Sequence, residues 1–205
     1  MNRYANEAIV VIDVQNDFCP GGALAVDKGD EVVPKINRIV RNYPVRVFTQ
    51  DWHTKGHGSF ASAHPGKAPF ETIDMPYGPQ LLWPDHCVQG TDGADFHEDL
   101  ITETAQMVLR KGFRSEIDSY SAFFENDHST ATGLEGYLRA RGVEAVTLVG
   151  LATDYCVAWS ALDAVRLGFS VTVRLDACRA IDLDGSLDTA LAEMKAAGVT
   201  LVDRS

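Results

Sequence analysis

The residue with the clearest capacity for chemistry in this sequence is Cys156, which stands where a predicted strand passes into a predicted helix. Unpaired N–H groups and the helix dipole favour a thiolate at the start of a helix. Lys111 can add a positive charge, and Asp13 can take or give a proton. A thiolate with an acid–base partner can perform covalent acyl transfer. The small residues before the cysteine would let the backbone N–H groups of Ala152 and Cys156 face a developing oxyanion.

Each of these residues also has a structural interpretation. A lone cysteine in a helix is more often a small core residue than a nucleophile. Asp13 could cap a loop through backbone N–H groups, and Lys111 could be a solvated charge at the end of a strand. The structural interpretation weakens because one predicted sheet edge would hold all three side chains. The other cysteines lack such surroundings and are predicted to be structural: Cys19, Cys87 and Cys178.

A second group of residues has the spacing of a metal site. Asp51 and His53 are two positions apart, and in an extended chain such side chains point the same way. His86 would complete a set of two imidazoles and one carboxylate. This set suits zinc, iron or manganese and leaves coordination positions open to water or substrate. His57 and His64 are nearby alternates, and a surface pair of histidines is the structural alternative.

The elements that must position these residues alternate between strands and helices. Runs rich in β-branched residues predict strands that are buried on both faces. The predicted strands span residues 8–14, 45–49, 106–109, 145–149, 170–175 and 200–202. Helices are predicted after a cap at Asp30, after a capping box of Thr132 and Glu135, and over residues 156–167 and 187–197. The order predicts an α/β fold of three layers, a doubly wound, mainly parallel six-stranded sheet with helices on both faces.

The predicted sheet determines where a ligand should bind. Ligands of such sheets bind beyond the carboxyl ends of the strands. Four predicted strands are followed there by five reactive side chains: Asp13, Asp51, His53, Lys111 and Cys156. The region of about 50–96 is rich in Gly, Pro and His and contains no predicted element, and long loops of this kind are usually functional. We expect residues 1–205 to form a single hydrolase domain with this region as a metal-site insert.

Composition excludes several classes of protein. The chain has 205 residues, 45% hydrophobic and 23% charged, which is typical of one globular domain. A net charge of -11 argues against a nucleic-acid partner. No apolar stretch is long enough to span a membrane, and the apolar run at residues 8–12 is too short for a signal sequence. The sequence therefore predicts a cytoplasmic protein whose four cysteines are free thiols, ligands or catalysts.

A series of motifs resembles the isochorismatase-like cysteine hydrolases over nearly the whole chain. The motifs are V-I-D-V-Q-N-D-F-C-P-G-G at 11–22, T-Q-D-W-H at 49–53, S-F-A at 59–61, W-P-D-H-C-V-Q-G-T at 83–91, K-G at 111–112, Y-S-A-F at 120–123 and G-L-A-T-D-Y-C-V at 150–157. Within this superfamily the sequence is most similar to the nicotinamidase/pyrazinamidase branch. The D-W-H and W-P-x-H-C motifs discriminate, because many relatives lack this metal site.

The resemblance implies a role for each of these residues. The catalytic triad would be Asp13, Lys111 and Cys156. One divalent metal ion per chain, zinc before iron or manganese, would be held by Asp51, His53 and His86, with waters and the pyridine nitrogen of the substrate completing its coordination. The ring would lie against Phe18, Trp83 and Tyr120. The Leu151–Ala152 peptide would be cis and would turn the Ala152 N–H toward the oxyanion. The resemblance leaves open whether His57 joins the metal site.

The resemblance also implies an activity, the hydrolysis of nicotinamide to nicotinate and ammonia through a thioester, with pyrazinamide as a further substrate. It implies a homo-oligomer without locating an interface. Three alternatives remain at this point. They are hydrolysis of a carbamoyl or ureido amide, which would need basic residues in place of the ring walls; vinyl-ether hydrolysis, against which Cys156 argues; and a metal-binding or thiol-sensing protein without turnover.

Overall fold

The strand-forming runs of the sequence meet in one parallel sheet. A computed structural model describes residues 6–203. The six strands of this sheet lie in the order β5-β2-β1-β6-β7-β8, and every neighbouring pair is parallel. Their bounds are β1 Glu7–Ile12, β2 Val45–Asp51, β5 Met107–Lys111, β6 Ala145–Leu151, β7 Ser170–Arg179 and β8 Thr200–Val202. The predicted doubly wound sheet is confirmed.

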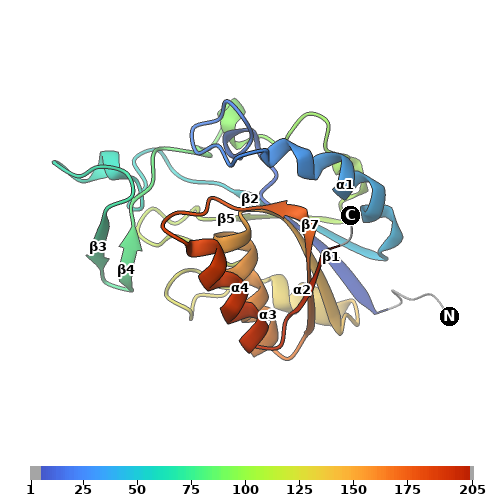
Figure 1. Cartoon of the computed structure of the whole chain (residues 1–205). Helices are drawn as coiled ribbons and strands as arrows, with labels where there is room; N and C mark the ends of the chain where they lie inside the picture. The colour runs from blue at the N-terminus through green and yellow to red at the C-terminus, as the bar shows by residue number, and fades with distance from the viewer. Residues whose placement is uncertain (1–5, 204–205) are drawn as a thin grey trace.

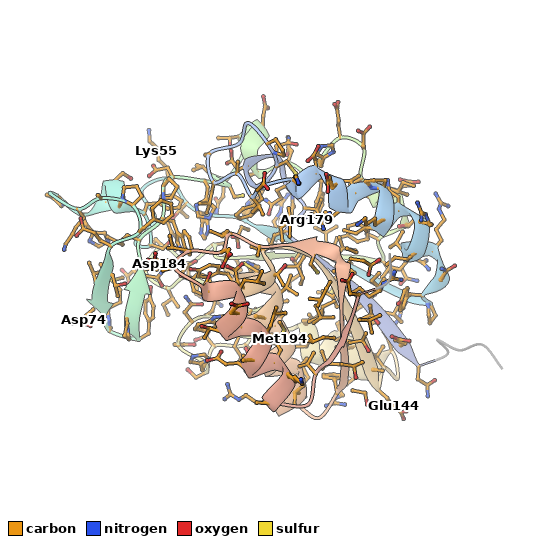
Figure 2. All side chains as sticks on the ribbon, viewed as in Figure 1. Lys55, Asp74, Glu144, Arg179, Asp184 and Met194 are labelled. Carbon is orange, nitrogen blue, oxygen red and sulfur yellow. The ribbon has the colours of Figure 1, made fainter. Side chains whose placement is uncertain are left out.

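Within the described residues, four α-helices cover the sheet. They are α1 Val32–Ile39, α2 Leu134–Ala140, α3 Ala158–Arg166 and α4 Ser186–Ala196. Because crossovers between parallel strands are right-handed, the reversal of strand order at β1 places α1 on one face and the later helices on the other. Figure 1 shows α1 on one side of the sheet and α3 with α4 on the opposite side. Apolar side chains of the helices pack into the core, and Ile36 of α1 and Met194 of α4 are fully buried. Figure 2 labels Met194.

The strand order reverses between β1 and β6, in the middle of the sheet. From β1 the chain goes outward through β2 to β5, and from β6 it goes the other way through β7 to β8. A crevice opens at such a point because the two loops leave in opposite directions. Asp13 directly follows β1, and Cys156 lies five residues after the end of β6 at Leu151. The topology therefore brings these two residues together.

Several strands end later than the sequence predicts. β2 and β6 each continue two residues, to Asp51 and Leu151, and β7 continues to Arg179. The prediction stopped where hydrophobicity ends, whereas backbone pairing continues through polar residues and through Gly150, which pairs with Ile12. β1 ends early, at Ile12, because Asp13 has a left-handed backbone with φ of 47°.

The predicted helix caps are wrong in detail. Asp30 lies inside a 3-10 turn, Gly29–Glu31, and does not cap α1. The Thr132 hydroxyl accepts a hydrogen bond from the N–H of Leu134 (3.3 Å). The N-cap of α2, however, is Gly133 and not Thr132, because the helix begins at Leu134. Glu135 pairs with Arg139 at 3.5 Å on the helix surface instead of reaching back to Thr132, so the predicted capping box is not formed.

The insert of about 50–96 contains a hairpin that the sequence analysis missed. Strands β3 Thr72–Met75 and β4 Gly78–Leu81 pair antiparallel and project at one end of the molecule (Figure 1). These strands are short and contain Asp74 and Pro79, so they lack the apolar alternation that identifies a strand. Within residues 6–203, no helix is long and apolar enough to cross a membrane.

Gly150 provides a test of the packing at the reversal point. Its φ is +117°, and a Cβ there would lie 2.1 Å from the carbonyl oxygen of Ile12. We predict that Gly150→Ala lowers the free energy of unfolding by about 3 kcal/mol or more, which corresponds to a fall in Tm of roughly 6 °C or more. Gly136→Ala, in open space on the exposed side of α2, should instead raise stability by up to about 1 kcal/mol. Thermal unfolding of both variants decides; a parent-like Tm for Gly150→Ala contradicts this packing.

Candidate active site

The ammonium group of Lys111 lies at the centre of a buried cluster at the carboxyl ends of the strands. Its Nζ is 2.8 Å from Asp13 Oδ2, forms a second ion pair with Asp51, and donates to the Ser119 carbonyl oxygen at 2.8 Å. The same Nζ is 3.5 Å from Cys156 Sγ. Neither Lys111 nor Asp13 is exposed to solvent. The three residues that the sequence analysis proposed as a triad therefore lie in contact through one cation.

Asp13 is held by β2 as well as by Lys111. The Thr49 hydroxyl donates to Asp13 Oδ1 at 2.6 Å and accepts from the Asp13 N–H at 3.2 Å. Thr49 was not predicted as a site residue, because its position in a predicted strand gives no sign of this contact. Burial raises the pKa of the Asp13 carboxyl, and the neighbouring charge of Lys111 only partly opposes this. A carboxyl with a raised pKa is suited to accept a proton and return it.

Cys156 lies in a tight turn that the sequence did not predict. The sequence predicts an α-helix from residue 156. In the structure the helical segment begins earlier, as a π-helical turn over Thr153–Val157, and regular α-helix follows only from Ala158. The Ala152 carbonyl accepts hydrogen bonds from the N–H groups of Tyr155 (3.2 Å) and Val157 (3.1 Å). The Leu151–Ala152 peptide bond is cis, as the resemblance implies. The turn places Ala152 and Cys156 in the lining of the same pocket.

The electrostatics of Cys156 differ from the expectation. We expected the helix start and Lys111 to favour a thiolate. Burial instead raises the pKa of the Cys156 thiol well above its usual value; Lys111 opposes this shift, while Asp13 and Asp51 add to it. The resting nucleophile is therefore a thiol. It needs a base, and Asp13 is the carboxyl in position to act as one.

Asp51, His53 and His86 form the candidate metal site, and their potential ligand atoms lie within 4.8 Å of one another. Asp51 Oδ2 is 3.6 Å from His53 Nε2 and 3.8 Å from His86 Nε2. The opposite nitrogen of each ring is engaged, His53 Nδ1 with the Gly112 carbonyl (3.0 Å) and His86 Nδ1 with the Pro84 carbonyl (2.8 Å). Such contacts orient Nε2 toward a metal.

The charge state of Asp51 also suits a cation. Burial alone would raise the pKa of Asp51, but the charges of Lys111 and His53 hold it well below its usual value. The group therefore offers one ionised carboxylate and two imidazole nitrogens, which fits a divalent ion such as zinc.

The alternates His57 and His64 are less suited to bind that metal. His57 donates through Nε2 to the Arg114 carbonyl (2.7 Å), and its Nδ1 is 2.8 Å from Ser59 Oγ, so both ring nitrogens are engaged. His64 Nε2 is 2.8 Å from the Gly58 carbonyl. His57 does form a second group of potential ligands with His53 and Asp118. Asp118, whose Oδ1 is 4.0 Å from His53 Nε2, was missed because nothing in its sequence surroundings marks it.

A pocket opens above the cluster and has aromatic walls. Phe18, Trp83 and Tyr120, the three predicted ring contacts, all line it. Trp83 Nε1 donates to the Tyr120 hydroxyl at 2.9 Å, and the Trp83 ring meets Tyr155 edge-on with centroids 4.9 Å apart. The sequence analysis missed the lining residues Leu24, Asp118, Tyr155 and Ile181. Asp51, His86, Ala152 and Cys156 complete the lining. The pocket can thus hold a flat apolar group between metal ligands and a thiol.

Comparisons with known proteins agree with this geometry. Residues 7–205 match the family model described as the isochorismatase domain. The chain is 55% identical to the nicotinamidase of Acinetobacter baylyi over 97% of this chain and 93% of that protein. Its structure is similar to that of the Acinetobacter baumannii nicotinamidase/pyrazinamidase, with a TM-score of 0.96, 55% identity and coverage of 98% and 97%. It is also similar to the Pyrococcus horikoshii pyrazinamidase in complex with zinc, with a TM-score of 0.78, 36% identity and coverage of 97% and 99%.

The contribution of the buried Lys111 ammonium group to the free energy of unfolding can be tested. Lys111→Met would leave Asp13 and Asp51 buried without their shared cation, and breaking a buried pair in this way costs about 3–5 kcal/mol. We predict a loss of that size in urea unfolding. Arg41→Met, which removes the exposed ion pair with Glu103, should change stability by less than about 1 kcal/mol. Equal effects of the two substitutions would contradict the central role of Lys111.

Proposed function

The chain belongs to the isochorismatase family, and we propose that it hydrolyses nicotinamide to nicotinate and ammonia through a thioester at Cys156. The observation that carries this proposal is that one pocket combines the Cys156 thiol with metal ligands and aromatic walls. A planar ring that bears a carboxamide and a nitrogen opposite the thiol matches these features together. The relatives of high identity carry the corresponding names.

Substrate binding relies on the ring. Phe18, Trp83 and Tyr120 would hold the pyridine ring and reduce the entropic cost of reaching the attack geometry. Asp51, His53 and His86 would hold one divalent metal, and zinc is favoured both by these ligands and by the zinc complex of the similar pyrazinamidase. Iron or manganese would also accept the ligand set. A metal held by these residues would supply Lewis-acid chemistry toward a ring nitrogen, which would help to orient the ring.

Acylation starts from the neutral thiol. Asp13 takes the proton of Cys156, and the ammonium of Lys111 stabilises the thiolate that forms. Sγ then attacks the carboxamide carbon. The N–H groups of Ala152 and Cys156 stabilise the negative charge that develops on the carboxamide oxygen. Asp13 gives the proton to the amide nitrogen, the C–N bond breaks, and ammonia leaves a thioester on Cys156.

Deacylation uses the same residues in the opposite direction. Asp13 takes a proton from a water molecule, and the resulting hydroxide attacks the thioester carbon. The C–S bond breaks, and the nicotinic acid that forms ionises and leaves as nicotinate. The proton on Asp13 returns to the sulfur of Cys156. Since Asp13 has a raised pKa, it can hold the proton between these steps.

The composition of the pocket favours a ring amide over the alternative amides. A carbamoyl or ureido substrate would need basic residues in the pocket, and none of the described residues that line it is Lys or Arg. The same aromatic walls would accept pyrazinamide.

We also propose that residues 1–205 form one domain in which the insert of about 50–96 contributes the metal ligands. One continuous hydrophobic cluster of the described residues supports this proposal. Assembly into a homo-oligomer and a cytoplasmic location stay predictions from the sequence.

The nucleophile is tested by Cys156→Ala. Removing the sulfur removes the covalent route, so ammonia release from nicotinamide should fall by roughly four orders of magnitude or more. Metal content and Tm should stay close to those of the parent protein. Cys178→Ala, at another buried thiol that does not line the pocket, should keep activity. Substantial turnover by Cys156→Ala would rule out the thioester.

The metal site is tested by His86→Ala. Loss of one imidazole ligand should lower both the zinc content, measured by inductively coupled plasma mass spectrometry, and the rate of ammonia release, by about tenfold or more each. His97→Ala, outside the group of potential ligands, serves as the matched control. If His86→Ala loses its metal but hydrolyses nicotinamide at the parent rate, the metal does not orient the ring.

A further inference from the structure

One buried polar side chain next to the pocket has no role in the mechanism above. Gln80 belongs to β4 of the projecting hairpin and is only 1% exposed. Its neighbours on the hairpin are exposed or half-buried, and the exposed Asp74 lies on the hairpin strand β3 (Figure 2). A buried amide on a small exposed hairpin requires several hydrogen-bond partners, because leaving its polar atoms unpaired would be costly.

The amide nitrogen of Gln80 bonds to two residues that line the pocket. Nε2 is 3.0 Å from both the Tyr120 hydroxyl and Asp118 Oδ2, and it shares its two N–H groups between these acceptors and the adjacent Leu81 carbonyl at 2.7 Å. The Tyr120 hydroxyl also accepts from Trp83 Nε1 at 2.9 Å. The two aromatic walls are thus joined at one oxygen atom, with ring centroids 6.1 Å apart and planes at 80°. Gln80 holds that oxygen from the hairpin side.

The amide oxygen of Gln80 also accepts two hydrogen bonds. Oε1 accepts from Asn126 Nδ2 at 3.2 Å and from the Tyr77 hydroxyl at 3.1 Å. Asn126 in turn accepts from the Tyr120 N–H at 2.9 Å. Bonds at both ends of the amide fix its orientation, so that its nitrogen faces Tyr120. The hairpin is thereby linked to the segment that carries Tyr120.

We infer that Gln80 is a positioning residue that sets the angle and spacing of Trp83 and Tyr120 for a flat ring amide. This inference rests on the proposed function. The effect should fall mainly on binding of the ring, because Gln80 bonds directly to the wall residue Tyr120, whereas its link to Lys111 runs indirectly through Asp118 and Ser119. Lys111 and Asp13 are also held by their own ion pair and by Thr49. The hairpin thus contributes to substrate selection through one amide without touching the substrate.

The test compares Gln80→Met with the parent protein on nicotinamide. Methionine has a similar length but cannot donate to Tyr120, so we expect KM to rise about tenfold while kcat stays within about twofold and zinc content is unchanged. Asp74→Asn, on the exposed part of the same hairpin, should leave KM unchanged. A parent-like KM for folded Gln80→Met overturns the inference. A matching fall in kcat and Tm also overturns it, because that result indicates a merely structural role.

A double-mutant cycle with Tyr120→Phe tests whether Gln80 affects KM through the Tyr120 hydroxyl. Phenylalanine removes the hydroxyl through which Gln80 acts, so Tyr120→Phe alone should raise KM, and the double variant should raise it no further than the larger single change. Multiplicative effects on KM overturn the inference. If Gln80→Met does not fold, Tyr120→Phe decides, since an unchanged KM contradicts the role of the hydroxyl. If the parent protein releases no ammonia from nicotinamide, the proposed function fails first and this inference with it.

Discussion

The burial of one ammonium group between two carboxylates is the interaction on which the rest of the site depends. Lys111 lies between Asp13 and Asp51 and faces the sulfur of Cys156. A buried cation next to two buried anions is tolerated because each charge is paired and hydrogen-bonded. The charge of Lys111 lowers the pKa of both carboxyls. With His53 it holds Asp51 ionised for a metal, whereas at Asp13 burial outweighs it and the pKa is raised. The surroundings of the shared cation therefore suit the two carboxylates to different tasks.

The topology of the sheet makes this arrangement possible. Lys111 ends an edge strand, Asp51 ends the next strand, and Asp13 follows the strand after that. Cys156 arrives from the opposite direction, across the point where strand order reverses. Each strand end thus contributes one functional group to the same edge. The insert then adds His86 and Trp83 above this polar layer, and the segments after β1 and β5 add Phe18 and Tyr120.

Much of the fold and of the site could be predicted from the sequence, for a simple physical reason. Buried parallel strands have continuous apolar runs, and their carboxyl ends must meet, so the proximity of Asp13, Lys111 and Cys156 follows from the order of elements. Thr49, Asp118 and Gln80 could not be found in this way, because their importance arises from side-chain contacts across distant segments. The raised pKa of Cys156 was also beyond prediction, since it depends on burial.

The central claim is that Cys156 carries the acyl group of the substrate. It is tested most directly by mixing the protein with nicotinamide, quenching the reaction with acid at short times, and mapping the modified peptide by mass spectrometry. We predict a nicotinoyl group on Cys156 that appears with the first release of ammonia and disappears as nicotinate forms. Nicotinoyl on another residue, or nicotinate formed in the first turnover with no protein-bound acyl group, would contradict it.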